Sequence, residues 1–256
     1  MAIELPTQKI EPKSQNPSRL ILFSPPKHGK TTAVAALDNC LLIDLESGSD
    51  FVSALKVKVN SLEELQELGT EIMKAERPYK YIAIDTVTKL EEMLEWDATE
   101  EYMKQPVGKA FNRDPKDLSK FLPRNQWKSV LTLAEGSGYQ HTRKWFLDQI
   151  EIFRQISPYR IYAAHVADKY IKDNGKEEVV GSEISLTGKL KTIFSSRVTS
   201  MCKIIADGDE RYLNFDVLND SIVAGSRAPH LKGRILISRK EKDGKIVTFW
   251  ENIFNK

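Results

Sequence analysis

The chain has 256 residues, enough for one large or two small domains, and its 38 basic and 36 acidic side chains nearly cancel. This balance excludes an acidic tail protein and a histone-like basic protein, while 41% hydrophobic and 29% charged residues are typical of soluble globular domains. The sequence lacks an apolar stretch near the roughly 20 residues that a membrane span needs, and also lacks a signal peptide's apolar core. We therefore expect a cytoplasmic protein without a membrane partner, with Cys40 and Cys202 reduced and buried.

Short apolar runs alternate with helix-forming segments after a polar, aperiodic N-terminal arm at residues 1–18. Fully buried strands are expected at residues 19–24, 40–45 and 81–85. A capping box at residues 61–64 begins a helix whose apolar residues share one face. Strands that alternate with helices in this way predict an α/β fold with a mainly parallel sheet.

The rest of the chain is expected to complete a single domain that spans residues 19–256. An irregular helical insertion at about 104–140 is interrupted by prolines and a GSG sequence, and a long amphipathic helix then leads to a fourth strand at 159–165. The part from about 198 to 256 is β-rich and includes a hairpin turn at the sequence KDGK.

The segment between the first strand and the next helix has the pattern of a phosphate-binding loop. In such a loop, backbone N–H groups face the phosphates, Lys30 reaches the outer phosphates and the Thr31 hydroxyl ligates magnesium. The standard pattern GxxxxGK[ST] has glycine where this chain has Ser24. A chance GKT sequence is the alternative. The residues expected to contact the nucleotide are Ser24, Pro25, Pro26, Lys27, His28, Gly29, Lys30, Thr31 and Thr32.

Asp85 ends the third buried strand, where a carboxylate can hold magnesium together with Thr31. An Asp at a strand end is also a common helix cap, so the assignment depends on the phosphate loop. The next residue is Thr86, where ATPases of the AAA type and packaging motors usually place the Glu that activates water. A carboxylate for that role must therefore come from elsewhere.

Asp44 and Glu46 follow the second buried strand in the sequence IDLES. The two-residue period of a strand predicts that both point to the same side, at the edge of the sheet where ligands bind in open α/β folds. Glu46 is the candidate for polarising the attacking water. The alternative is that both carboxylates cap a helix that starts near Asp50.

The order of these parts resembles the RecA-like recombination ATPases, over roughly residues 19–206. The resemblance implies that Glu46, in the sequence DLE, is catalytic, and that Asp85, in IDTVTKL, is the magnesium ligand. It also implies that His165, at the end of the fourth strand, is a sensor of the γ-phosphate, although a lone strand-end histidine is as often structural. The PPKxGKT loop and the length are most similar to the phage Sak-type annealing ATPases.

Charge is distributed unevenly along the chain. Residues 61–101 hold twelve acidic and four basic side chains, whereas residues 104–128 hold seven basic and two acidic ones with three aromatic residues interleaved. Basic loops with aromatic residues suit single-stranded nucleic acid, because cations contact phosphates and rings stack on bases. The candidates for DNA contact are Lys109, Arg113, Lys120, Arg124, Trp127, Lys169 and Lys172.

Two alternatives remain open for these cations. The basic segments can form solvated faces, or they can contact neighbouring subunits. Lys189 and Lys191, in the sequence TGKLK, are candidates for a contact to the nucleotide of an adjacent subunit, as basic residues make in the RecA-like family.

Together these features predict a phage protein that binds ATP, hydrolyses it with Mg²⁺ and binds single-stranded DNA in recombination or annealing. Lys30, Glu46 and His165 are the expected catalytic residues. The resemblance implies a ring or filament of identical subunits, and a single-strand-binding protein is a further expected partner. The alternative is a nucleotide-dependent assembly or helicase-loading factor with a protein partner and little hydrolysis.

Overall fold

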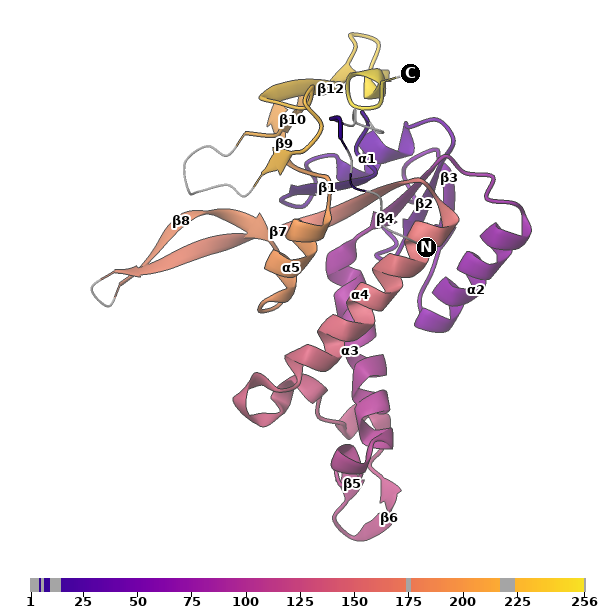
Figure 1. The fold of residues 1–256 in the computed structure, drawn as a ribbon, viewed down its shortest axis with the longest axis vertical. Coiled ribbons are helices and arrows are strands. Elements are labelled where there is room, and N and C mark those ends of the chain that lie inside the picture. The colour runs from indigo at the N-terminus through magenta and orange to yellow at the C-terminus, as the bar shows by residue number, and fades with distance from the viewer. Residues whose placement is uncertain (1–4, 6, 10–14, 174–175, 217–223, 256) are drawn as a thin grey trace.

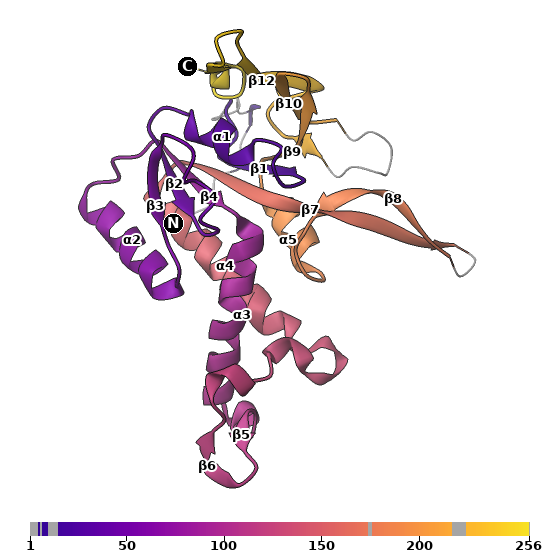
Figure 2. The ribbon, with the colours of Figure 1, turned by 180° about the vertical axis from the view of Figure 1, so that it is seen from behind.

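A largely parallel β-sheet organises the protein, with helices packed on its two faces (Figures 1 and 2). The computed structural model describes residues 5, 7–9, 15–173, 176–216 and 224–255. Most of the expected N-terminal arm therefore lies outside the described residues.

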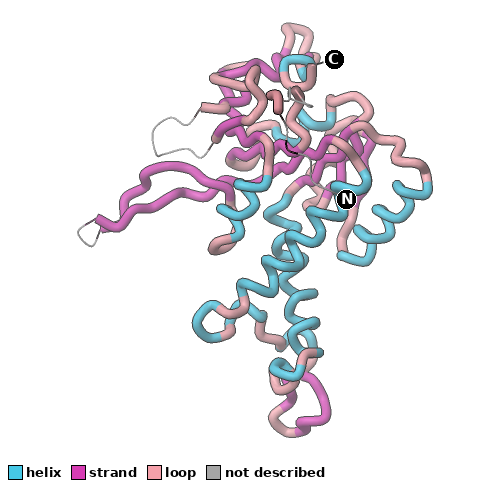
Figure 3. Tube along the Cα trace, in the orientation of Figure 1, coloured by secondary structure: helices cyan, strands magenta, loops and turns pink. Residues whose placement is uncertain are grey.

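Figure 3 shows how helices and strands alternate along the chain. In the first half the elements are β1 (Arg19–Ser24), α1 (Lys30–Ala35), β2 (Cys40–Asp44), β3 (Leu55–Lys58), α2 (Leu62–Lys74), β4 (Tyr81–Asp85), α3 (Val87–Lys104), η1 (Pro106–Gly108), β5 (Arg113–Asp114), β6 (Asp117–Phe121), η2 (Arg124–Gln126), η3 (Val130–Thr132) and η4 (Ala134–Gly136). In the second half they are α4 (Tyr139–Ile156), β7 (Tyr159–Asp173), β8 (Lys176–Ile184), α5 (Leu190–Arg197), β9 (Ser200–Asp207), β10 (Glu210–Asn214), β11 (Gly225–Ser226), β12 (Arg234–Lys240), β13 (Ile246–Thr248) and η6 (Trp250–Asn252).

The sheet has a parallel core and an antiparallel extension, which confirms the expected fold class. Its strand order is β13-β12-β10-β9-β1-β7-β4-β2-β3, and the six strands from β9 to β3 pair in parallel. The strands from β9 to β13 pair antiparallel and form the expected β-rich C-terminal part. Because parallel strands end at the same edge, the loops after β1, β2, β4 and the core part of β7 meet there.

Each central strand is buried on both faces, so its side chains fill two hydrophobic cores. In β1, Ile21 and Phe23 face the core beneath α2, α3, α4 and α5, whereas Leu20 and Leu22 face the core shared with α1 and the C-terminal strands. All four side chains are fully buried. This double burial explains why these strands are continuous apolar runs.

Two long structures project from the sheet in different directions (Figure 1). Helices α3 and α4 pack against each other as an arm, and the insertion at its end consists of short 3-10 helices and the two-stranded β5–β6 sheet. Strand β7 continues past the sheet core and pairs antiparallel with β8 in a long hairpin. The insertion is thus irregular, as expected, while the length of the hairpin is a feature that the sequence did not predict.

Candidate nucleotide site

The segment between β1 and α1 is a tight loop with two residues in the left-handed region. Lys27 has φ 65° and Gly29 has φ 89°, a conformation in which a lysine is unusual and glycine is favoured. Ser24 is the last residue of β1 and pairs with His165 in β7, so its backbone is extended. Serine therefore replaces the usual first glycine at a position that does not require a left-handed backbone.

Lys30 begins α1, and its side chain is buried against the loop. Its Nζ atom donates to the carbonyl oxygens of Ser24 at 2.9 Å and Pro25 at 3.2 Å, and to the Ser24 hydroxyl at 3.3 Å. Burial lowers the pKa of Lys30 below its ordinary value, and the carboxylates of Asp85 and Glu46 oppose that effect. The loop thus holds the Lys30 side chain at the start of α1. An anion bound there would be attracted both by the lysine and by the helix N-terminus.

Thr31 and Asp85 come together from two different elements. The Thr31 hydroxyl donates to Asp85 Oδ2 at 2.6 Å, which joins the start of α1 to the end of β4. Burial raises the pKa of Asp85; the Thr31 hydrogen bond opposes the rise, and the negative charges of Glu46 and Asp44 add to it. A hydroxyl oxygen and a carboxylate side by side are the hard donors that Mg²⁺ prefers.

Asp44 shapes the turn that follows β2. Its carboxylate accepts hydrogen bonds from the backbone N–H groups of Glu46 at 3.0 Å, Gly48 at 3.2 Å and Ser49 at 2.9 Å, and from the Ser49 hydroxyl at 2.5 Å. Burial alone would raise the pKa of Asp44, but these hydrogen bonds outweigh it and lower the pKa. Asp44 is therefore a structural residue of the turn.

The expectation that Asp44 and Glu46 point to the same side is wrong, because β2 ends at Asp44 and the strand period ends with it. The alternative of a helix cap is also wrong, since the described residues from 45 to 54 contain no helix. Asp44 is turned inward, and Glu46 is left at the rim of the site.

Glu46 contacts two other strand ends through its carboxylate. Its Oε1 atom accepts a hydrogen bond from the Thr86 hydroxyl at 2.5 Å, and His165 Nε2 lies 2.9 Å from Oε1 and 3.2 Å from Oε2. About a third of the Glu46 side chain is exposed. Residues that follow β2, β4 and the core part of β7 thus meet at one partly exposed carboxylate.

His165 is fixed by its backbone as well as by its ring. Its N–H group donates to the Thr88 hydroxyl at 3.1 Å, and among the described residues its buried Nδ1 atom has no hydrogen-bond partner. Thr86 and Thr88 both lie at the start of α3, so this helix contacts Glu46 and His165 at the same time. Neither threonine was among the expected site residues, although both lie in the sequence IDTVTKL that contains Asp85.

The other expected loop residues lie around this centre with different exposure. Pro26 and Lys27 are exposed, whereas Pro25, His28 and Thr32 are partly buried. His28 Nδ1 lies 3.1 Å from the Pro26 carbonyl oxygen, within the loop itself. Pro26 and Lys27 therefore form the most exposed part of the loop.

Most of the residues expected to contact DNA lie far from this centre, at or near the end of the α3–α4 arm (Figure 1). The Arg113 guanidinium lies 3.8 Å from the Phe121 ring centroid, and Lys120 forms an ion pair with Asp117 at 3.0 Å. The Trp127 indole N–H donates to a backbone carbonyl of the same insertion. Lys109 is exposed beside them.

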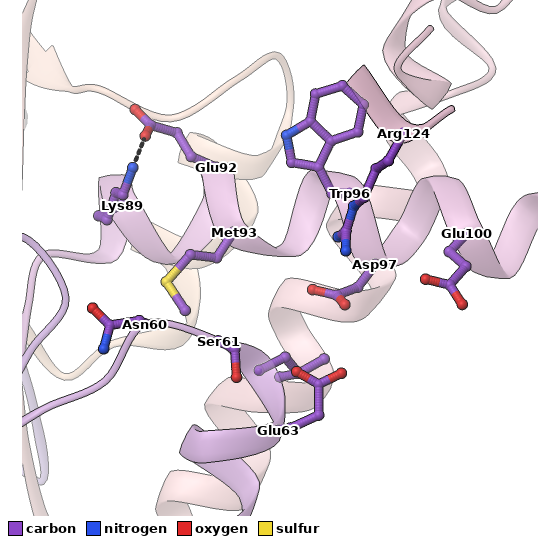
Figure 4. Close-up of a pocket in the computed structure, with 11 residues that line it drawn as sticks. Asn60, Ser61, Glu63, Lys89, Glu92, Met93, Trp96, Asp97, Glu100 and Arg124 are labelled. Carbon is purple, nitrogen blue, oxygen red and sulfur yellow. Dashed lines mark hydrogen bonds and ion pairs between the residues drawn. The ribbon is translucent and has the colours of Figure 1, made fainter. Parts of the chain in front are cut away.

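Arg124 lies in a different environment, in a pocket of about 450 Å³ between the start of α2 and α3 (Figure 4). Trp96 and the carboxylates of Glu63, Asp97 and Glu100 line the same pocket. Burial raises the pKa of Asp97, Glu63 adds to the rise and Arg124 opposes it. Carboxylates therefore surround Arg124, and they would repel the phosphate groups of a nucleic acid.

The remaining expected cations belong to the hairpin and to the segment after it. Lys169 and Lys172 lie on the path of β7, but their side chains are outside the described residues. Lys189 is exposed directly before α5, whereas Lys191 forms an ion pair with Glu183 of β8. Lys189 is thus exposed for a contact to another subunit, whereas Lys191 would first have to leave its ion pair with Glu183.

The described residues contain neither a cluster of metal-ligating side chains nor a membrane-spanning helix. Within them there is no group of three or more His, Cys, Asp or Glu side chains that could hold a metal ion. Mg²⁺ does not need such a group, because it usually binds through one or two carboxylates together with water and substrate phosphates. In the same part of the chain, no helix is long and apolar enough to cross a membrane.

Comparison with solved structures gives remote similarity. One neighbour is described as the crystal structure of the RadB recombinase, with a TM-score of 0.44 and 11% identity over 91% of this chain and 92% of that one. Another is a KaiC-like protein from the hyperthermophilic archaeon Pyrococcus horikoshii OT3, with a TM-score of 0.43 and 11% identity over 90% and 89% of the two chains. A search of curated proteins found no match.

Residues 16–228 match the model of a family described as an AAA domain. The match includes the phosphate loop, the end of β4 and His165. The chain therefore matches this family although it has Thr86, and not an acidic residue, directly after Asp85. By this match, and by the parallel sheet with the phosphate loop after β1, the chain belongs to the AAA domain family and has a RecA-like P-loop ATPase fold.

Proposed function

We propose that the protein binds ATP, hydrolyses it with Mg²⁺ and binds single-stranded DNA in recombination or strand annealing. The observation that carries the proposal is the meeting of Lys30, the Thr31–Asp85 pair and Glu46 at the edge where the parallel strands end. These are a cation for phosphates, two oxygen donors for a divalent metal and a carboxylate for water, which are the parts that phosphoryl transfer to water needs.

The loop residues and Lys30 bind the phosphates in this proposal. Backbone N–H groups of the loop and of the first turn of α1 donate to the phosphate oxygens, and the Lys30 ammonium exchanges its bonds to the loop carbonyls for bonds to phosphate. Thr31 and Asp85 supply the oxygen atoms that hold Mg²⁺. When bound, Mg²⁺ neutralises the negative charge that develops on the phosphate oxygens.

Glu46 orients and polarises the attacking water in this proposal. Its carboxylate is ready to accept a proton or a hydrogen bond because it is partly exposed and is held by Thr86 and His165. His165 holds Glu46 at one end of the site, so the histidine senses any change in the position of that carboxylate. Preorganised groups of this kind contribute most of the barrier reduction in phosphoryl transfer.

DNA binding is proposed for the two structures that project from the sheet. The insertion combines seven basic with two acidic residues between positions 104 and 128, and its exposed Lys109 and Lys120 suit phosphate contacts. Aromatic residues beside them suit stacking on unpaired bases. Lys169 and Lys172 of the hairpin are proposed as a second contact.

The resemblance to phage Sak-type ATPases adds three further proposals: a phage origin, assembly into a ring or filament, and cooperation with a single-strand-binding protein. Serine in place of the first loop glycine would favour the alternative, a loading factor with little hydrolysis, if it impaired phosphate binding. Because Ser24 has the extended backbone of β1, the serine gives no reason to expect impaired phosphate binding. We therefore keep the recombination or annealing ATPase as the proposal.

The test measures ATP hydrolysis with and without single-stranded DNA, for the wild type and for Lys30→Ala. We expect DNA to stimulate turnover in the wild type and Lys30→Ala to abolish it, because the loop loses its buried cation. Lys74→Ala, which removes an exposed lysine paired with Glu71 on α2, is the matched control and should behave as the wild type. Hydrolysis that ignores DNA at both low and high salt would contradict the DNA part of the proposal and favour the loading factor.

A further inference from the structure

A pocket of about 200 Å³ lies beside the phosphate loop, where the loop meets the C-terminal strands. One wall comes from the loop and α1, and the other comes from the β9–β10 turn, β10, β12 and β13. The residues that line it are Lys27, Gly29, Thr32, Asp209, Arg211, Ser238, Lys240 and Ile246.

The pocket and the magnesium residues lie on opposite sides of the loop. Thr31 faces Asp85 across the start of α1, while the next residue, Thr32, lines the pocket. Since successive helical residues point about 100° apart, their side chains reach different surroundings. The sheet order agrees, because β9, β10 and β12 lie beyond one edge of β1, and β7 and β4 lie beyond the other.

The loop and the C-terminal strands are in close contact at this pocket. Arg211 Nη1 donates to the carbonyl oxygens of Gly208 and Glu210 at 2.8 Å each, which fixes the guanidinium in the β9–β10 turn. Its Nε atom lies 3.7 Å from the position that a Cβ atom would take at Gly29. The C-terminal part therefore contributes a positioned planar cation directly beside the phosphate loop.

The pocket is lined by both apolar and hydrogen-bonding side chains, and a nucleoside can use both. Ile246 is 44% exposed and offers an apolar surface, and the Arg211 guanidinium is a plane on which an aromatic ring can stack. Asp209, Ser238 and Lys240 offer hydrogen-bonding groups for the edge of a base or for ribose hydroxyls. The volume is below the roughly 300–1,000 Å³ of a whole ligand site, so the pocket suits one part of a larger ligand.

We propose that this pocket binds the base and ribose of the nucleotide whose phosphates occupy the loop. The inference rests on the proposed nucleotide binding and extends it, because it makes the β-rich C-terminal part a component of the site. A triphosphate with its terminal group at Asp85 then runs across the loop toward Thr32, and its nucleoside enters the pocket.

The test compares the binding of ATP and of inorganic tripolyphosphate, each with Mg²⁺, by calorimetry on the full chain. Ile246→Ala and Lys240→Ala are made singly and together, with Lys30→Ala for the phosphate loop. Lys245→Ala is the matched control, because this exposed lysine precedes Ile246 and does not line the pocket. A thermal unfolding curve for each variant verifies that it folds.

We expect the double variant to lose about tenfold or more in ATP affinity, since an apolar surface and a hydrogen-bonding group are both removed. Its affinity for tripolyphosphate should stay within about twofold of the wild type. Unchanged ATP affinity in the double variant would overturn the proposal that the pocket binds the nucleoside, and would leave the proposed phosphate binding intact. An equal loss of affinity for ATP and for tripolyphosphate would also overturn the pocket proposal. A wild type that binds neither ligand would instead overturn the proposed function together with the pocket.

A second measurement does not depend on any variant. Photolysis of the wild-type protein with 8-azido-ATP and Mg²⁺ should attach the base to a peptide from residues 209–211 or 238–246. Competition by excess ATP should abolish this labelling. Labelling confined to peptides outside the pocket would overturn the inference.

Discussion

Asp44 offers the sharpest test of how the site is built, because its carboxylate holds the turn that carries Glu46. The substitution Asp44→Asn keeps the size and shape of the side chain but removes its charge and one of its two acceptor oxygens. In the structure, those two oxygens accept three backbone N–H groups and one hydroxyl. The asparagine NH₂ group would face donors instead of acceptors.

The expected magnitude follows from these contacts. A hydrogen bond to a charged group contributes about 1.5–3 kcal/mol, and leaving a buried donor without a partner costs about 1–3 kcal/mol. The four bonds share one carboxylate and are not additive. We therefore expect Asp44→Asn to lower the free energy of unfolding by about 3 kcal/mol. Asp50→Asn is the control in the same turn, because its ion pair with Lys58 is exposed on both sides and is expected to contribute about 1 kcal/mol or less.

The assay is urea unfolding at equilibrium, analysed with a common m value for the wild type and both variants.

The same assay, repeated at several pH values, tests how the stabilisation by Asp44 depends on pH. The pKa of Asp44 is lowered in the folded state, so its stabilisation is present above the unfolded pKa of about 3.9 and is lost as the pH falls through the folded pKa. The difference between wild type and Asp44→Asn should stay constant from about pH 6 to 8 and shrink below about pH 4. A loss no larger than that of Asp50→Asn at pH 7 would refute the role of Asp44.

Four further predictions concern the chemistry, the core and the DNA contact. Glu46→Gln should lower ATP turnover at least about tenfold with little change in ATP affinity, and turnover within about threefold of wild type contradicts the water-orienting role. Asp85→Asn should raise the Mg²⁺ concentration for half-maximal turnover about tenfold or more, and EDTA should stop hydrolysis by the wild type. Phe146→Ala should lower the free energy of unfolding by about 3–5 kcal/mol in urea, because the ring is fully buried 5.2 Å from Phe194; a loss below about 1 kcal/mol is inconsistent with this packing. Lys109→Ala should reduce the salt slope of single-stranded DNA binding by about 1 in a titration with labelled DNA, and an unchanged slope excludes the contact.

The buried part of the fold could be predicted from the sequence because each central strand is an uninterrupted apolar run. Strands β1 and β4 begin and end where the pattern indicated, and the expected strand at 159–165 forms the core part of β7. Strand β3 was missed, because its four residues lie at the edge of the sheet and are mostly exposed. The β7–β8 hairpin was missed for a related reason, since its outer residues lack an apolar face to set a period.

The candidate site divides in the same way. The phosphate loop and Asp85 could be identified because each depends on local sequence. The loop is a glycine-containing turn after a strand, and Asp85 is the last residue of an apolar strand. The inward turn of Asp44 was not predictable, because it depends on backbone N–H groups that the chain presents only after it leaves β2. The nucleoside pocket was not predictable either, because it depends on which strands lie beyond β1 in the sheet, and no local pattern encodes strand order.

The elements that carry the site also carry the two projections. Helix α3 begins at Val87, directly after Asp85 and Thr86, and continues without a break into the arm that ends in the basic insertion. Strand β7 carries His165 next to Glu46 and continues into the hairpin. Helix α3 and strand β7 therefore connect Thr86 and His165, which both contact Glu46, to the arm and to the hairpin that carry the proposed DNA contacts. DNA affinity measured with and without ATP reports on this connection, because affinity can depend on nucleotide only if the two bound states differ at one of these elements.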